Sequence, residues 1–276
     1  MTTLTLMKNS LMTAASLACM AMTLGLSEAP AKALSVTQNN NGNDLLNSLL
    51  GSTSGLSNFS VTTTGLPNAF GLFSNDTVFG LGSGVVLSTG NAVDAVGPND
   101  TGSKSGPGNL AQIDIKFDAD NTVDKLFFQY VFGSEEFLEY AGSPFNDSFQ
   151  LLLNGTNLAL LGNGKPVTVN NLAASPIGPF DPAFVNNTGN ETQLDGYTKA
   201  LVFQGLLKKN ASNSLSIKIA DVGDSSYDSA VFIKGGSIAV VPPNAIPTPA
   251  LLPGLIGLGL GVLRKRKAEA AASSEA

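Results

Sequence analysis

The chain has 276 residues, with 21 Asp and Glu, 15 Lys and Arg, no His, no Trp and a single Cys. Residues 34–245 hold 18 of the acidic residues, nine Lys and no Arg, His or Cys, which gives this region a formal charge of −9. The charge excludes a nucleic-acid-binding face, and the missing His and Cys exclude the usual general base, thiolate chemistry and the common zinc ligands. Oxygen ligands remain, and hard cations are their natural partners.

Residues 1–33 have the layout of a secretory signal peptide. Lys8 supplies the positive charge, an apolar stretch covers residues 11–26, and Ala31 and Ala33 form a small-x-small cleavage site. The apolar stretch is shorter than the roughly 20 residues that a membrane-spanning helix needs. The sequence therefore predicts export, with cleavage after Ala33.

Residues 34–241 are expected to form one all-β domain. The spacing of the leucines in 44–50 predicts a short N-terminal helix with Asn43 as its cap. Beyond it, Gly, Asn, Asp and Ser separate short segments rich in Val, Ile, Phe and Thr, which is typical of strands and turns. The predicted strands are 59–63, 85–88, 113–117, 126–132, 149–153, 167–170, 200–203, 215–219 and 231–240. Such a succession predicts an antiparallel β-sandwich of jelly-roll type, with 126–132 as a central strand.

The last 35 residues, 242–276, are predicted to lie outside this domain. Residues 242–249 are a proline-rich linker and sorting motif, which is stiff because proline fixes φ. Residues 250–267 combine an apolar tail helix with the basic stop-transfer cluster 264–267, and 268–276 form a disordered extension. The apolar part is short for a span, so we expect membrane attachment through this tail to be transient.

The motif formed by Pro247, Thr248, Pro249 and Ala250, followed by an apolar stretch and a basic cluster, resembles the PTPA variant of the PEP-CTERM sorting signals. The resemblance implies processing by an exosortase-like enzyme and an origin in cyanobacteria or similar Gram-negative bacteria. The acidic, alanine-rich extension after Lys267 departs from the usual pattern, in which the tail stops near the basic cluster.

The body of the chain resembles the choice-of-anchor L domain, a family of exported modules that carry different surface anchors. The stretches that carry the likeness are GVVLSTG at 84–90, FQYVFGSEEF at 128–137 with FNDSF at 145–149, DGYT at 195–198, and 219–233. Together they span most of the predicted domain. The resemblance implies a location at the outer surface or in the extracellular matrix.

Two groups of oxygen-bearing side chains follow two of the predicted strands. One group follows 126–132 and the other follows 215–219, and their members are Glu135, Glu136, Glu139, Asn146 and Asp147, then Asp221, Asp224 and Asp228. If the two strands are neighbours, all eight side chains meet at one edge. Ca²⁺ takes six to eight such oxygens, so we predict a calcium site there. The alternative is that Asp and Asn form turns and Glu is simply solvated.

These features predict a non-enzymatic exported module that binds Ca²⁺ and acts in adhesion or in envelope or matrix association, with polysaccharide or another surface protein as partner. The alternative function is a hydrolase that acts on surface polysaccharide through an acidic cleft. That chemistry needs two carboxylates about 5–10 Å apart in a sugar cleft, usually with aromatic platforms. The absence of Trp argues against it.

Overall fold

The computed structural model describes residues 33–100 and 108–243. The predicted signal-peptide stretch up to residue 32, the Pro247–Ala250 motif, the tail helix within 250–267 and the 268–276 extension lie outside these residues. Within the described ranges, no helix has the length and apolar character needed to cross a bilayer.

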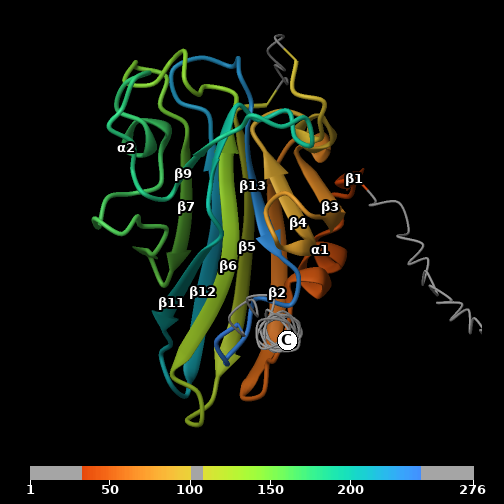
Figure 1. The fold of residues 1–276 in the computed structure, drawn as a ribbon. Coiled ribbons are helices and arrows are strands. Elements are labelled where there is room, and N and C mark those ends of the chain that lie inside the picture. Colours follow the sequence, from red (N-terminus) through yellow and green to blue (C-terminus); the bar gives the residue numbers. More distant parts are fainter. Residues whose placement is uncertain (1–32, 101–107, 244–276) are drawn as a thin grey trace, which may run out of the picture. The chain divides into compact units, whose positions relative to one another are not determined.

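The fold consists of two antiparallel sheets (Figure 1). The first sheet has the strand order β1 (Ser35–Gln38), β3 (Phe70–Asp76), β4 (Gly82–Ser88), β13 (Ser229–Lys234), β6 (Lys125–Ser134), β10 (Gly196–Thr198) and β9 (Phe184–Asn186), and β11 (Leu201–Leu206) also pairs with β6. The second sheet has the order β2 (Leu56–Gly65), β5 (Leu110–Ala119), β12 (Ala211–Ala220), β7 (Ser148–Leu153) and β8 (Thr156–Asn157). The predicted antiparallel β-rich fold is confirmed, and the jelly-roll connectivity stays a prediction.

One apolar core joins the inner faces of the two sheets. Alternate residues of β5, such as Ile113 and Phe117, are buried in the same cluster as Phe128 and Tyr130 of β6. Because successive side chains of a strand point to opposite faces, this alternation marks one buried face for each sheet. The two sheets therefore pack face to face as a sandwich.

The outer face of the first sheet is also covered in part. Val131 of β6 and Phe232 of β13 belong to a second buried cluster, together with Leu34 and Phe79 from segments outside these two strands. β6 pairs with β13 along one edge and with β10 and β11 along the other. The prediction that this strand is central is confirmed.

The short helices differ from the prediction in two places. The N-terminal helix α1 (Gly42–Leu49) is capped by Asn41, whose side chain accepts hydrogen bonds from the N–H groups of Asn43 and Asp44. The predicted cap Asn43 was therefore wrong by two residues. The predicted strand 167–170 was also wrong, because Thr168 caps a short helix, α2 (Val169–Leu172). Two 3-10 turns, η1 (Pro67–Ala69) and η2 (Ala92–Ala95), complete the helical elements of the described residues.

The final predicted strand, 231–240, is shorter than expected. β13 ends at Lys234, and Gly236 follows with φ of +66°, a conformation that glycine adopts without strain. Beyond this turn, Ile238 and Ala239 form only single bridges, to Leu50 and Phe127 respectively. The chain thus leaves the sheet beside the first part of β6.

Candidate functional site

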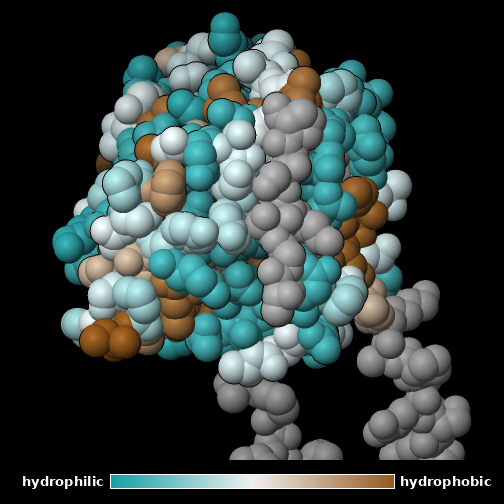
Figure 2. Space-filling view, turned by 90° about the horizontal axis from the view of Figure 1, so that it is seen from above, coloured by the Kyte–Doolittle hydropathy of each residue, from teal (hydrophilic) through white to brown (hydrophobic). Residues whose placement is uncertain are grey.

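Two chain connections meet at one end of the sandwich, the upper end in Figure 1. One links β6 to β7, the other links β12 to β13, and they are joined by hydrogen bonds of 3.1 Å from Asn146 N to the Val222 carbonyl and from Glu135 N to the Asp228 carbonyl. Figure 2 views the molecule from this end, where hydrophilic residues predominate. The strands β6 and β12 lie in different sheets, so the condition that they are neighbours is not met. Their carboxylates still converge, because β7 pairs with β12 and β13 pairs with β6.

The strand register explains this convergence. Ser148 at the start of β7 lies opposite Ala220 at the end of β12, so Asp147 and Asp221 occupy adjoining positions. In the other sheet, Ser229 at the start of β13 lies opposite Ser134 at the end of β6. The residues just outside these paired ends are thereby held close together by two sheets at once.

Glu136 and Asp147 are deeply buried. Their exposed fractions are 1% and 0%. Asp147 Oδ1 accepts a hydrogen bond of 2.9 Å from the N–H of Val222. The second oxygen of each carboxyl, Glu136 Oε2 and Asp147 Oδ2, is buried without a hydrogen-bond partner among the described residues. Unpartnered buried carboxyl oxygens are costly and call for a physical explanation.

Asp221 and Ser229 add further buried oxygens to the same place. Both carboxyl oxygens of Asp221 and the hydroxyl of Ser229 are buried without a hydrogen-bond partner within the described part of the chain. The N–H of Asp224 and the hydroxyl of Ser229 lie near Asp221 and Asp147 respectively, without reaching hydrogen-bond geometry. Five polar atoms in this region are therefore buried without a hydrogen-bond partner among the described residues.

The carboxyl groups perturb one another. Burial, followed by the charges of Asp147 and Asp224, raises the pKa of Glu136 to about 8. Burial and the same two neighbours raise the pKa of Asp221 to about 7. Burial raises the pKa of Asp147 to about 6, and the charge of Asp224 adds to the effect. No lysine is among the causes of these shifts, so protons or a bound cation must balance the charge.

We call Glu136, Asp147, Asp221 and Asp224 the acidic cluster. Asp224 lies at its edge, where its carboxylate accepts a hydrogen bond of 3.1 Å from Ser226 N. Asp228 is 5% exposed and also raises the pKa of Asp221. Its carboxylate packs on the backbone of Gly90, where a Cβ atom would lie only 1.8 Å from Asp228 Oδ2.

The other residues proposed from the sequence lie outside the cluster. Glu135 is buried, at 2% exposure, and follows β6 directly. Glu139 is exposed to solvent. Asn146 uses its side-chain oxygen to accept a hydrogen bond of 2.9 Å from Asn170 N, so it fixes the start of α2. Of the eight residues, the structure brings five together, namely the four of the acidic cluster and Asp228. It gives Asn146 a structural role.

Two tyrosines border the cluster. Tyr140 and Tyr227 have ring centroids 4.7 Å apart and hydroxyls joined by a hydrogen bond of 3.1 Å. Tyr227 has φ of +62°, which costs an ordinary side chain of order 1–3 kcal/mol. Sequence reasoning missed Gly90, Ser229 and Tyr227, although all three lie in the segments 84–90 and 219–233 that carry the family likeness.

The cluster can hold a cation only if its ligands move. Among the described residues, no three His, Cys, Asp or Glu side chains are already arranged to hold a metal ion. The cluster and the adjacent Ser229 nevertheless offer only carboxylate and hydroxyl oxygens, which are ligands of the kind that Ca²⁺ takes. The β12–β13 connection contains Tyr227, whose φ of +62° is strained, and Gly223, whose φ of +119° is open to glycine without strain.

Comparison with known proteins identifies one relationship. The family model described as the choice-of-anchor L domain matches residues 35–239. No curated protein and no solved structure shows significant similarity to the chain. The matched region contains the acidic cluster, Gly90 and every strand described above.

Proposed function

We propose that this chain, which belongs to the choice-of-anchor L domain family, is an exported module whose acidic cluster binds Ca²⁺. The family supports a place at the cell surface or in the extracellular matrix. We further propose that the Pro247–Ala250 motif directs sorting by an exosortase-like enzyme, with membrane attachment through the tail. Adhesion to polysaccharide or to another surface protein is the role we assign to the module.

The observation that carries the calcium proposal is the set of unpartnered oxygens. Glu136, Asp147 and Asp221 each bury at least one carboxyl oxygen that no donor of the described chain satisfies. A protein that needed only a stable core would fill such positions with apolar side chains, since an unpaired buried charge is destabilising. A hard divalent cation satisfies several of these oxygens at once and removes their mutual repulsion.

The same burial argues against the alternative, a polysaccharide hydrolase. Both carboxyls of a glycosidase must reach a sugar ring from the two sides of the scissile bond. Glu136, Asp147 and Asp228 have exposed fractions of 5% or less. Side chains this deeply buried do not reach a sugar ring at the surface, so we propose that the module is not an enzyme.

A calcium titration of the purified protein tests the proposal. Two of the four tyrosines border the cluster and the chain has no Trp, so tyrosine fluorescence reports on this region. We expect Ca²⁺ to change this signal and to raise the melting temperature. At a hundredfold excess over Kd, the stabilisation is about 2.7 kcal/mol, or roughly 5–10 °C for a domain of this size. Mg²⁺ serves as the control cation. No response to millimolar Ca²⁺ sinks the proposal.

A further inference from the structure

The first sheet has an open edge along β11. On the same side of β6, β9 pairs with β10 and Lys199 N donates a hydrogen bond of 2.8 Å to the Ala183 carbonyl. The residue before Ala183 is Pro182, which has no N–H to donate, and the pairing ends there. Among the described residues, no strand pairs with the outer edge of β11. A strand position in line with β9 is therefore vacant beside Leu201–Leu206, at the margin of the sheet in Figure 1.

The vacant position is apolar. The segment 200–207 holds no charged residue. Val202 is 55% exposed and Leu206 is 73% exposed, both on the face of β11 opposite to buried Phe203. Proteins usually protect such an edge with a charge or proline within the strand or with a covering segment, and β11 has no internal charge or proline.

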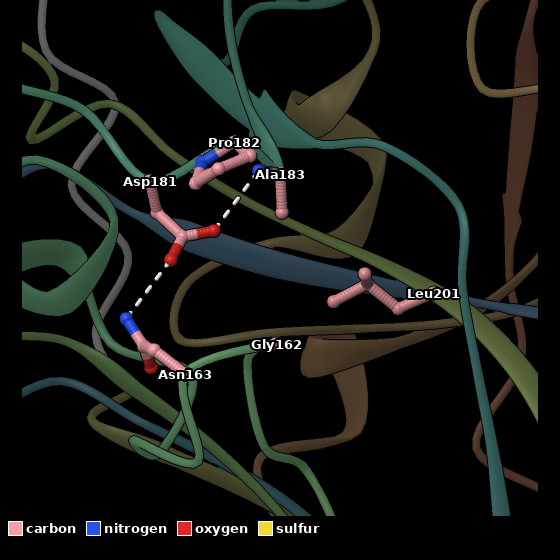
Figure 3. Close-up of a pocket in the computed structure, with 6 residues that line it drawn as sticks. All are labelled: Gly162, Asn163, Asp181, Pro182, Ala183 and Leu201. Atoms are coloured by element: carbon pink, nitrogen blue, oxygen red, sulfur yellow. Dashed lines mark hydrogen bonds between the residues drawn. The ribbon is translucent and has the colours of Figure 1, made fainter.

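Two pockets flank the vacant position, one at each end of β11. The first has a volume of about 500 Å³ and is lined by Gly162, Asn163, Asp181, Pro182, Ala183 and Leu201 (Figure 3). Its carboxylate, Asp181, is held by hydrogen bonds from Asn163 Nδ2 at 3.1 Å and Ala183 N at 2.9 Å. The second pocket, of about 490 Å³, is lined by Leu206 and Leu207 on one side and by Leu153 and Leu158 on the other. Side chains of an added strand that point between the sheets would enter these pockets.

The charges around the edge select the occupant. Exposed Lys199 precedes β11, and exposed Lys208 and Lys209 follow it. In an antiparallel pair of two β11 strands, Lys199 of one copy would face Lys208 and Lys209 of the other, and this repulsion disfavours a second copy of the chain. An extended segment with acidic residues at the end that meets Lys208 and Lys209 is complementary instead.

We propose that the open edge of β11 binds an extended, apolar segment of another protein that carries acidic residues at one end, by addition of a strand to the first sheet. Backbone hydrogen bonds to β11 would supply affinity and the two pockets would supply side-chain selectivity. The distance from Leu201 to Leu206 along the strand is roughly 16 Å, so residues i and i+4 of the segment reach toward the two pockets. This proposal is independent of the acidic cluster.

A labelled peptide tests the proposal with the full chain. The probe has two glutamates followed by alternating valine and threonine, and its control carries two lysines in place of the glutamates. We expect the acidic peptide to bind and to protect the β11 amides from hydrogen exchange. The K208E/K209E variant should bind it at least tenfold more weakly, because the attraction at two positions is lost and repulsion replaces it.

Further controls separate a strand from nonspecific apolar binding. L206E should weaken binding, whereas V93E, which alters a side chain that is 42% exposed on η2 near β1, should not. A peptide with prolines at alternate positions should fail to bind, because proline cannot donate backbone hydrogen bonds. Equal affinity for the acidic and lysine peptides, binding without protection of β11, no binding at all, or self-association through β11 would each overturn the proposal. Melting curves confirm that every variant is folded.

Discussion

Replacing Glu136 by Gln tests the acidic cluster most sharply, because it removes a buried ionisable group and preserves the shape of the side chain. Glu136 is 1% exposed and its Oε2 has no hydrogen-bond partner among the described residues. The new amide would donate toward the unpartnered oxygens of Asp147 and Asp221. We therefore expect E136Q to be more stable than the parent protein when calcium is chelated, and insensitive to added Ca²⁺.

The magnitude follows from the pKa of Glu136. It is raised from 4.5 to about 8, and each step of one in pKa corresponds to about 1.4 kcal/mol. At pH 7, which is 2.5 above the ordinary pKa of 4.5, folding therefore costs at most about 3.5 kcal/mol to keep this group protonated and buried. Relaxation of its surroundings reduces the figure to roughly 2 kcal/mol. For a domain of this size, about 2 kcal/mol raises the melting temperature by roughly 4–8 °C.

Calorimetry in chelator and in millimolar Ca²⁺ measures both effects. E139Q is the matched control, since Glu139 lies three residues further along the chain and is exposed. We expect E139Q to behave like the parent protein in both conditions. If E136Q loses stability in chelator and still gains stability with Ca²⁺, then the carboxyl is a structural group and the reasoning fails.

Three further predictions address the surroundings of the cluster and the N-terminal helix. In the presence of a chelator, the free energy of unfolding should rise as the pH falls from about 8 to about 5.5. Folding raises the pKa values of Glu136, Asp147 and Asp221, so their protonation stabilises the folded protein, and this stability is lost as the pH climbs through those values. Denaturant titrations at each pH measure the profile, which Ca²⁺ should flatten. G90A should cost about 1–3 kcal/mol and weaken the calcium response, because its Cβ displaces Asp228, whereas G162A meets open space and should melt like the parent protein. N41A should cost about 1 kcal/mol through loss of the helix cap and N43A much less, and equal losses in thermal melts would contradict the cap assignment.

The strands with strict alternation were predictable from sequence. β5 and β12 place Ile113 and Ile217 on a buried face, and each of these residues lies opposite the other in the sheet. Period-two patterns report a local property, the burial of one face, so they survive without any knowledge of the partner strand. The strand predicted at 167–170 was wrong for the opposite reason. A single side chain, Thr168, caps a helical turn there, and residue preferences alone do not predict that turn.

The composition of the acidic cluster was partly predictable, and its architecture was not. The sequence indicated that carboxylates follow the two strand ends, since that is visible along the chain. It left open whether β6 and β12 are neighbours, and the structure brings their ends together through β13 and β7 instead. Strand pairing depends on contacts between residues far apart in the sequence, and the burial of Glu136 depends on that pairing. Neither can be predicted from local sequence patterns.

The acidic cluster and the open edge of β11 lie at opposite ends of the same strand. Glu136 comes two residues after β6 ends, and β11 pairs with the first part of β6, from Lys125 to Tyr130. Leu201, at the end of β11 nearer to the cluster, lies opposite Tyr130, which is six residues before Glu136 and therefore roughly 20 Å from it along the strand. A ligand at one end does not touch a ligand at the other, and β6 is held on both edges by neighbouring strands. Because linkage requires two arrangements that both ligands distinguish, Ca²⁺ should leave peptide affinity unchanged. A measured coupling would mean that β6 shifts as a unit between two positions.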